Sequence, residues 1–167
     1  MTEQNIEQSA EQASVDSPAA GAFLPGLVSD RDHAQLSRLV TESAWRVDLG
    51  EAKTLHELFT ADGELVVGQP FKGRDEIRLW GENLDMTNPY PGIRHLVSNM
   101  RFVATGTDAE GRDTAEGTTV LTVFLQDANG RTTSTPWVVG EDHDCFVRTD
   151  VGWRFTSRSW VQLFGRD

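Results

Sequence analysis

The chain has 167 residues, of which 38% are hydrophobic, and this size and composition predict one domain with a single sizeable core. Its 26 acidic and 15 basic residues give a formal net charge of -11 at pH 7, which disfavours nucleic acid and anionic membrane surfaces as partners. Cys145 is the only cysteine, so an intrachain disulfide and a cysteine-based metal cage are excluded, and a cytoplasmic location is expected.

The first 28 residues differ in composition from the rest of the chain. They contain four acidic residues, no lysine or arginine, and several prolines and glycines. We therefore expect residues 1–28 to form a disordered acidic arm and residues 29–167 to form the domain. The N-terminus has neither the basic start nor the apolar block of a signal peptide, and no apolar run approaches the roughly 20 residues that cross a bilayer.

The first predicted helix begins near Asp30, the expected N-cap, and ends near Gly50. Its apolar residues share one face: Leu36, Leu39, Val40, Ala44 and Val47. Asp48 lies at the edge of this face in the last turn, where the helix dipole disfavours a carboxylate by a few tenths to about 1 kcal/mol. Helix stability therefore does not explain Asp48, which is either a functional carboxylate or a solvated turn residue.

Further elements follow in a regular order. A short helix is expected over residues 52–59, a strand over 64–67, a turn, and a third helix over 75–85. The loop over 88–92 is stiffened by two prolines. Four strands then follow, over residues 94–105, 114–126, 132–148 and 153–163, and the turns between them are too short for parallel crossovers. This order predicts an α+β domain whose helices cover one face of a strongly curved antiparallel sheet and enclose a cone-shaped cavity.

The strand that begins near residue 94 carries unexpected polar residues. His95 and Asn99 share one face of this strand with Val97. Since histidine titrates near neutrality, its presence on a core-like strand suits the wall of a cavity. The alternatives are a core histidine bonded to a backbone carbonyl and a structural amide bonded to a neighbouring loop.

Five short motifs carry a resemblance to a known family. They are DLGE at 48–51, LFTADGE at 58–64, FKGRDEI at 71–77, RHLVSN at 94–99 and GWRFTSR at 152–158. In order and spacing they resemble the SnoaL-like branch of the nuclear transport factor 2 superfamily, with members such as scytalone dehydratase, bile-acid dehydratase and polyketide cyclases. The resemblance implies a cone-shaped barrel around an apolar pocket, commonly dimeric, which serves both enzymes and non-catalytic binding domains.

The resemblance also implies roles for particular residues. Asp48 matches the carboxylate at the end of the first helix in dehydratase-like members, and His95 matches their strand histidine. The family often has a tyrosine near the Asp48 position, where this chain has Ser43, Ala44 and Trp45. The only tyrosine is Tyr90, so a phenol that polarises a substrate carbonyl is either Tyr90 or absent.

A buried Asp48–His95 pair would suit proton transfer. The carboxylate orients the imidazole, whose other nitrogen can take a proton beside a carbonyl and return it to a leaving hydroxyl. We therefore predict a cofactor-independent lyase or isomerase, of the dehydratase or cyclase type, acting on a small apolar oxygenated molecule such as a polyketide, steroid-like or aromatic intermediate. Two alternatives stay open: an epoxide-opening hydrolase or cyclase that uses carboxylates, and a non-catalytic ligand-binding or assembly subunit.

A second polar cluster lies in the third of the four strands. Asp142 and Asp144 share one face and His143 the other, so a regular strand cannot direct all three at one metal, and no metal or cofactor is expected. One aspartate is expected either to enter the pocket or to pair with Arg158. The residues predicted to bind substrate are Tyr90, Asn99, Asp142, Asp144, Trp45 and Trp137. A homodimer is expected through the outer face of the sheet.

Overall fold

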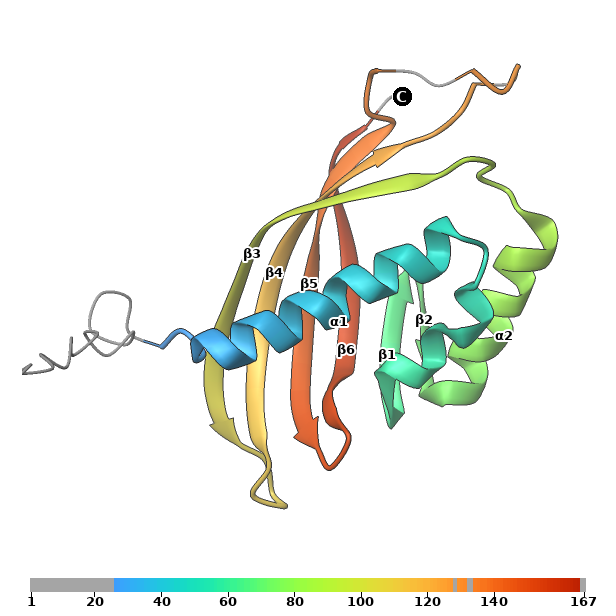
Figure 1. Ribbon diagram of the computed structural model, residues 1–167. Coiled ribbons are helices and arrows are strands. Elements are labelled where there is room, and N and C mark those ends of the chain that lie inside the picture. The colour runs from blue at the N-terminus through green and yellow to red at the C-terminus, as the bar shows by residue number, and fades with distance from the viewer. Residues whose placement is uncertain (1–25, 128, 132–133, 166–167) are drawn as a thin grey trace, which may run out of the picture.

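The computed structural model describes residues 26–127, 129–131 and 134–165 (Figure 1). The chain first forms helix α1 (Asp30–Asp48), the 3-10 helix η1 (Ala52–Leu58), strands β1 (Phe59–Val67) and β2 (Gln69–Lys72), and helix α2 (Gly73–Thr87). Four long strands follow: β3 (Arg94–Thr107), β4 (Asp113–Phe124), β5 (Val138–Thr149) and β6 (Gly152–Gly165). The predicted α+β order is confirmed. The short strand β2 was not predicted, because a turn was expected there.

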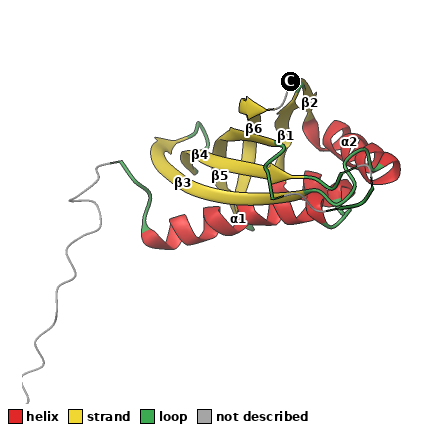
Figure 2. Cartoon of the chain, turned by 90° about the horizontal axis from the view of Figure 1, so that it is seen from above, coloured by secondary structure: helices red, strands yellow, loops and turns green. Residues whose placement is uncertain are grey.

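The six strands form one mixed sheet in the order β2-β1-β6-β5-β4-β3. The predicted antiparallel pairing of β3, β4, β5 and β6 is confirmed, whereas β1 pairs parallel with β6. The sheet is therefore mixed rather than wholly antiparallel. Since β2 and β3 are its two edges, the sheet curves strongly but does not close into a barrel. Figure 2 shows α1 lying along the curved strands, with α2 beside β1 and β2.

Helix α1 is placed by its cap and its apolar face. Ser29, rather than Asp30, is the N-cap, and its hydroxyl accepts a hydrogen bond from the backbone N–H of Asp32. The buried face belongs to one core cluster with four phenylalanines that come from β1, β3, β5 and β6: Phe59, Phe102, Phe146 and Phe155. Each buried phenylalanine stabilises the fold by about 1.5–3 kcal/mol. The same core cluster extends to Leu55 and Leu65, which also line a pocket.

The predicted arm lies almost entirely outside the described residues. Residues 26–28, which were assigned to it, belong to the folded domain instead. Leu27 forms an isolated antiparallel bridge with Val103, and the Ala104 N–H donates to the carbonyl of Gly26 at 2.8 Å. The domain therefore begins before the predicted boundary, because this segment supplies hydrogen bonds to the edge strand β3.

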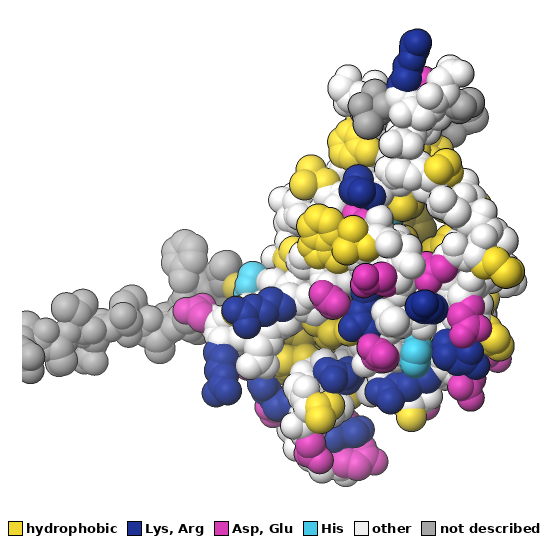
Figure 3. Space-filling view, turned by 45° about the vertical axis from the view of Figure 1, so that its right-hand side comes forward, with side chains coloured by type: hydrophobic (Ala, Val, Ile, Leu, Met, Phe, Trp, Pro, Cys, Tyr) yellow, Lys and Arg dark blue, Asp and Glu magenta, His cyan; other side chains and the backbone are white. Residues whose placement is uncertain are grey.

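Charged side chains are spread over the surface. Figure 3 shows hydrophobic side chains gathered in the upper part of one face, with acidic and basic side chains interspersed below them. Among the residues that the structure describes, no helix is both long and apolar enough to span a membrane.

The contact between α2 and η1 depends on Gly81. A Cβ atom at Gly81 would overlap the carbonyl of Ala52 and lie 2.8 Å from the backbone nitrogen of Lys53. The same turn of η1 is held by Asp85, which accepts hydrogen bonds from the backbone N–H groups of Ala52 and Lys53, both at 2.9 Å.

Gly81→Ala is therefore expected to lower the free energy of unfolding by about 1–3 kcal/mol, because backbone atoms cannot yield to the new methyl group. Helix propensity alone would predict a gain of about 1 kcal/mol. Urea unfolding followed by circular dichroism measures the difference. Asn83→Ala, at an exposed position on the same helix, serves as the control and should stay within about 0.5 kcal/mol of wild type. A stabilised Gly81→Ala variant would contradict this account of the packing.

Candidate active site

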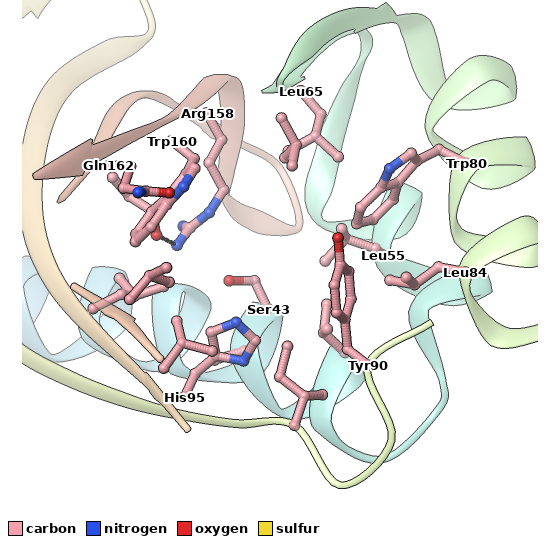
Figure 4. Close-up of a pocket in the computed structure, with 18 of the residues that line it drawn as sticks. Ser43, Leu55, Leu65, Trp80, Leu84, Tyr90, His95, Arg158, Trp160 and Gln162 are labelled. Carbon is pink, nitrogen blue, oxygen red and sulfur yellow. Dashed lines mark hydrogen bonds and ion pairs between the residues drawn. The ribbon is translucent and has the colours of Figure 1, made fainter. Parts of the chain in front are cut away.

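A pocket of about 330 Å³ lies between the concave face of the sheet, the second half of α1 and helix α2 (Figure 4). Its walls are mainly aliphatic and aromatic, which is typical of a site for a small organic molecule. The aromatic walls are Trp80, Tyr90, Trp137 and Trp160. The polar lining residues are Ser43, His95, Asp142, Arg158 and Gln162.

His95 lines one wall of this pocket, and Asp48 contacts it from behind that wall. His95 Nδ1 lies 2.6 Å from Asp48 Oδ1, and the backbone N–H of His95 donates to Asp48 Oδ2 at 3.0 Å. Both side chains are largely buried, with 4% of Asp48 and 14% of His95 exposed. Since an ionised carboxylate only accepts hydrogen bonds, Nδ1 carries the proton and Nε2 is the ring nitrogen available to a ligand.

The same contacts explain how the fold positions the pair. Asp48 is the last residue of α1, and His95 is the second residue of β3. Arg94 donates a hydrogen bond from Nη1 to the carbonyl of Asp48 at 2.8 Å. The carboxylate and the carbonyl of Asp48 therefore both fasten the end of α1 to the start of β3, which offsets the unfavourable place of a carboxylate at a helix C-terminus.

A second polar group lies across the pocket on β5 and β6. Asp142 and Asp144 share one face, as predicted, and this face is the inner one, whereas His143 faces outward, where it pairs with Glu141 at 3.3 Å. Arg158 on β6 forms a hydrogen-bonded ion pair with Asp142, and its Nη1 lies 3.1 Å from Asp144 Oδ2. Asp142 and Arg158 line the pocket, so both alternatives offered for this cluster hold for Asp142.

Burial controls the ionisation of these two carboxyl groups. It raises the pKa of Asp142, and the positive charge of Arg158 and its hydrogen bond to Asp142 oppose this effect. The pKa of Asp144 is raised to about 7, mainly by burial. The negative charge of Asp142 also raises this pKa, whereas the positive charge of Arg158 lowers it. The cluster thus places two carboxyl groups beside one guanidinium group.

The structure corrects the placement of three predicted substrate-binding residues. Asn99 has φ +50 and lies in a bulge of β3, between the registers at Ser98 and Arg101, so it is exposed and outside the pocket. Trp45 is half exposed and lines a shallow groove on the outer side of α1. Asp144 lies behind Arg158 rather than in the pocket lining. The bulge matters because it interrupts the strict alternation from which Asn99 was placed.

Tyr90 and Trp137 do line the pocket, and their ring centroids are 5.3 Å apart. Figure 4 shows the hydroxyl end of Tyr90 directed into the cavity, between Trp80 and Arg158. Trp137 comes from the segment before β5, so the two rings belong to different loops at the mouth. The two partly exposed rings are tilted by 42° and contact each other, an arrangement that is favourable for aromatic pairs.

Several lining residues were not predicted as site residues. Arg158, Trp160 and Gln162 recur at every second position of β6, which directs all three side chains into the pocket. This period-two pattern was present in the sequence and could have found them. Within the described part of the chain, no group of three or more histidine, cysteine, aspartate or glutamate side chains is arranged to hold a metal ion.

A curved sheet that cups an apolar pocket, with helices on its concave face, defines an α+β pocket protein of the nuclear transport factor 2 type. The sequence model for the SnoaL-like domain matches residues 29–159, and the chain belongs to this family. No curated protein matches the chain significantly.

Solved structures support the fold. Aln2 from a Streptomyces species superposes with a TM-score of 0.65 at 18% identity, over 81% of this chain and 94% of that chain. A nuclear-transport-factor-2-like protein with a cystatin-like fold, from Novosphingobium aromaticivorans, gives 0.64 at 25% identity, over 81% and 84%. A proposed scytalone dehydratase from the same organism gives 0.60 at 18% identity, over 80% and 85%.

Proposed function

We propose that the protein is a cofactor-independent lyase or isomerase, of the dehydratase or cyclase type, with His95 as general acid and base and Asp48 as its partner. The observation that carries this proposal is the 2.6 Å contact between His95 and Asp48 at the wall of an apolar pocket. Membership of the SnoaL-like family, which includes dehydratases and cyclases, supports it.

The chemistry follows from what each side chain can donate or accept. His95 Nε2 takes a proton from the carbon next to a substrate carbonyl, and the Asp48 carboxylate stabilises the resulting imidazolium. Arg158, across the pocket, stabilises the negative charge that develops on the carbonyl oxygen. The imidazolium then gives the proton to the leaving hydroxyl, and water departs as a carbon–carbon double bond forms. For an isomerisation, the proton returns to a different carbon.

The pocket walls indicate the kind of substrate. Four aromatic rings and several aliphatic side chains surround a volume of about 330 Å³. Such walls favour a small, largely apolar ring compound whose oxygen substituents face His95 on one side and Asp142 and Arg158 on the other. A polyketide, steroid-like or aromatic intermediate has this character.

The buried Asp142–Arg158 pair favours a second candidate, an epoxide-opening hydrolase or cyclase. In that reaction a carboxylate at the pocket wall activates water and a carboxylic acid protonates the epoxide oxygen. Asp142 lines the pocket, and burial raises the pKa of its carboxyl group. His95 would then not transfer the proton.

A panel of compounds separates these functions. The purified protein is mixed with β-hydroxy ketones that carry one or two rings, and dehydration is followed by the absorbance of the new conjugated double bond. Matching epoxides are assayed for diol formation. Dehydration by the wild type and not by His95→Gln is the expected result. Turnover of the epoxides alone would favour the carboxylate mechanism. Tryptophan quenching without any turnover would favour a non-catalytic binding protein.

We also propose that the protein is a homodimer through the outer face of the sheet. The strand register aligns Leu96, Thr122, Val139 and Phe164 in one row on this face. Leu96 and Phe164 are 58% and 68% exposed, and Val161 nearby is 43% exposed. An exposed apolar surface of this kind is typical of an interface between copies.

Light scattering is expected to give twice the monomer mass for the wild type. Leu96→Glu combined with Val161→Glu should give the monomer, because each copy would place buried charges opposite the other's apolar face. Met86→Glu, an equally polar change on the exposed side of α2, is the control and should leave the dimer intact. A wild type that is monomeric at all concentrations would disprove this proposal.

A further inference from the structure

Asp144 is a buried carboxyl group that the proposed chemistry does not use. Its side chain is fully buried, and its Oδ2 accepts a hydrogen bond from Arg158 Nη1 at 3.1 Å. Its other oxygen, Oδ1, is buried and has no hydrogen-bond partner among the described residues. An ionised carboxylate in this position would leave one charged oxygen unsatisfied in the interior, which is costly.

The positive charge beside Asp144 is shared with a second carboxyl group. Arg158 contacts both Asp144 and Asp142, and its contact with Asp142 is the closer one. The residue that faces Asp144 from β4 is Gly117, which has no side chain to offer. Asp142 is the better partner of Arg158, because its contact with the guanidinium group is the closer one and Asp144 keeps one oxygen without a partner among the described residues. If both aspartates were ionised, the cluster would hold one uncompensated negative charge, so one proton has to be bound and Asp144 is its better site.

We propose that Asp144 is a positioning residue that holds a proton at neutral pH, so that Asp142 remains a carboxylate and its ion pair with Arg158 stays directed at the pocket. The protonation of Asp144 stands on the geometry of the cluster alone. Its relevance to turnover rests on the proposed function of the pocket.

The electrostatics of the cluster agree with this assignment. Burial raises the pKa of Asp144 to about 7, and the negative charge of Asp142 contributes to the rise. An aspartate in the unfolded chain loses its proton near pH ~3.9. Between about pH 4 and pH 7 the folded protein therefore binds a proton that the unfolded chain has released. Through Asp144, the stability of the fold falls as the pH rises through this window.

The test is a carbon-13 titration of the aspartate carboxyl groups in the full chain, without any ligand. In the wild type we expect the carboxyl carbon of Asp144 to titrate near neutral pH and that of Asp142 to titrate lower. In Asp144→Asn, which keeps the shape of a protonated aspartate, the near-neutral step should vanish. The midpoint of Asp142 should stay close to its wild-type value, because Asp144 is already neutral at the pH where Asp142 titrates. Asp150→Asn, in an exposed turn, is the control and should leave the near-neutral step in place.

Stability provides a second readout. The free energy of unfolding of the wild type, measured in urea at intervals from about pH 4 to pH 7, should fall as the pH rises. This fall should be smaller in Asp144→Asn, whereas Asp150→Asn should follow the wild type. A wild-type signal of Asp144 that titrates near pH ~4, or a near-neutral step that persists in Asp144→Asn, overturns the proposal. Assignment of the wild-type signals decides the matter even if the variant fails to fold. None of these measurements uses a substrate, so the proposed reaction can fail independently.

Discussion

His95→Gln is expected to lower turnover by about 10²-fold to 10⁴-fold, which is the usual contribution of general acid–base catalysis, while the protein still folds. Glutamine keeps the approximate length of histidine and its backbone N–H can still donate to Asp48, but its side chain cannot transfer a proton. Asp48→Asn is expected to slow the same reaction, because an amide no longer stabilises the imidazolium and can hold the ring in the wrong tautomer. Initial rates on the dehydrated compound from the panel measure both effects.

The double variant decides whether the two residues act as one unit. If Asp48 works only through His95, the loss in Asp48→Asn/His95→Gln should equal that in His95→Gln alone. Glu51→Gln removes an exposed carboxylate three residues further along and is the matched control, with an unchanged rate expected. Circular dichroism confirms folding in each case. Wild-type rates in His95→Gln would exclude the acid–base role, and additive losses would mean that the two side chains work separately.

The second large effect is expected from Arg158→Met. Methionine keeps part of the side-chain volume but leaves Asp142 and Asp144 buried without their shared cation. Breaking a buried ion pair by removing one partner costs about 3–5 kcal/mol, and a loss of this size in the free energy of unfolding is expected at pH 7. Since Arg158 lowers the pKa of both aspartates, its removal raises both values. The loss should therefore shrink as the pH falls and both carboxyl groups become neutral.

Two further variants separate the charge effect from packing. Arg148 makes the same kinds of contact in a more exposed place: it bonds Asp32 at 2.6 Å and Asp113 at 2.9 Å and lies over the ring of Trp153. Arg148→Met should cost only about 1 kcal/mol or less, because exposed ion pairs contribute little. Adding Asp142→Asn and Asp144→Asn to Arg158→Met should recover much of its loss. If Arg158→Met unfolds within about 1 kcal/mol of wild type at pH 7, the cluster does not stabilise the fold as described.

Local patterns in the sequence determined most of the elements and several of their faces. The spacing of apolar residues indicated α1, whose side chains Leu36 and Val40 are fully buried as the helical period requires. Alternation along β5 indicated that Asp142 and Asp144 share one face and that His143 lies on the other, and the structure shows that the shared face is the inner one. Short connections indicated the antiparallel order of the four long strands, because a short turn allows no other pairing.

Which faces meet was decided only by the tertiary structure. The contact of Asp48 with His95 joins the end of a helix to a strand 47 residues later, and composition and spacing do not specify it; the family resemblance suggested it. The parallel pairing of β1 with β6 joins segments far apart in the chain, beyond the reach of any turn argument. The bulge at Asn99 arises from the pairing of β3 with β4 and turns its side chain out of the pocket. Periodicity thus determines which face of an element is apolar, whereas long-range pairing determines its partner and each local break in its register.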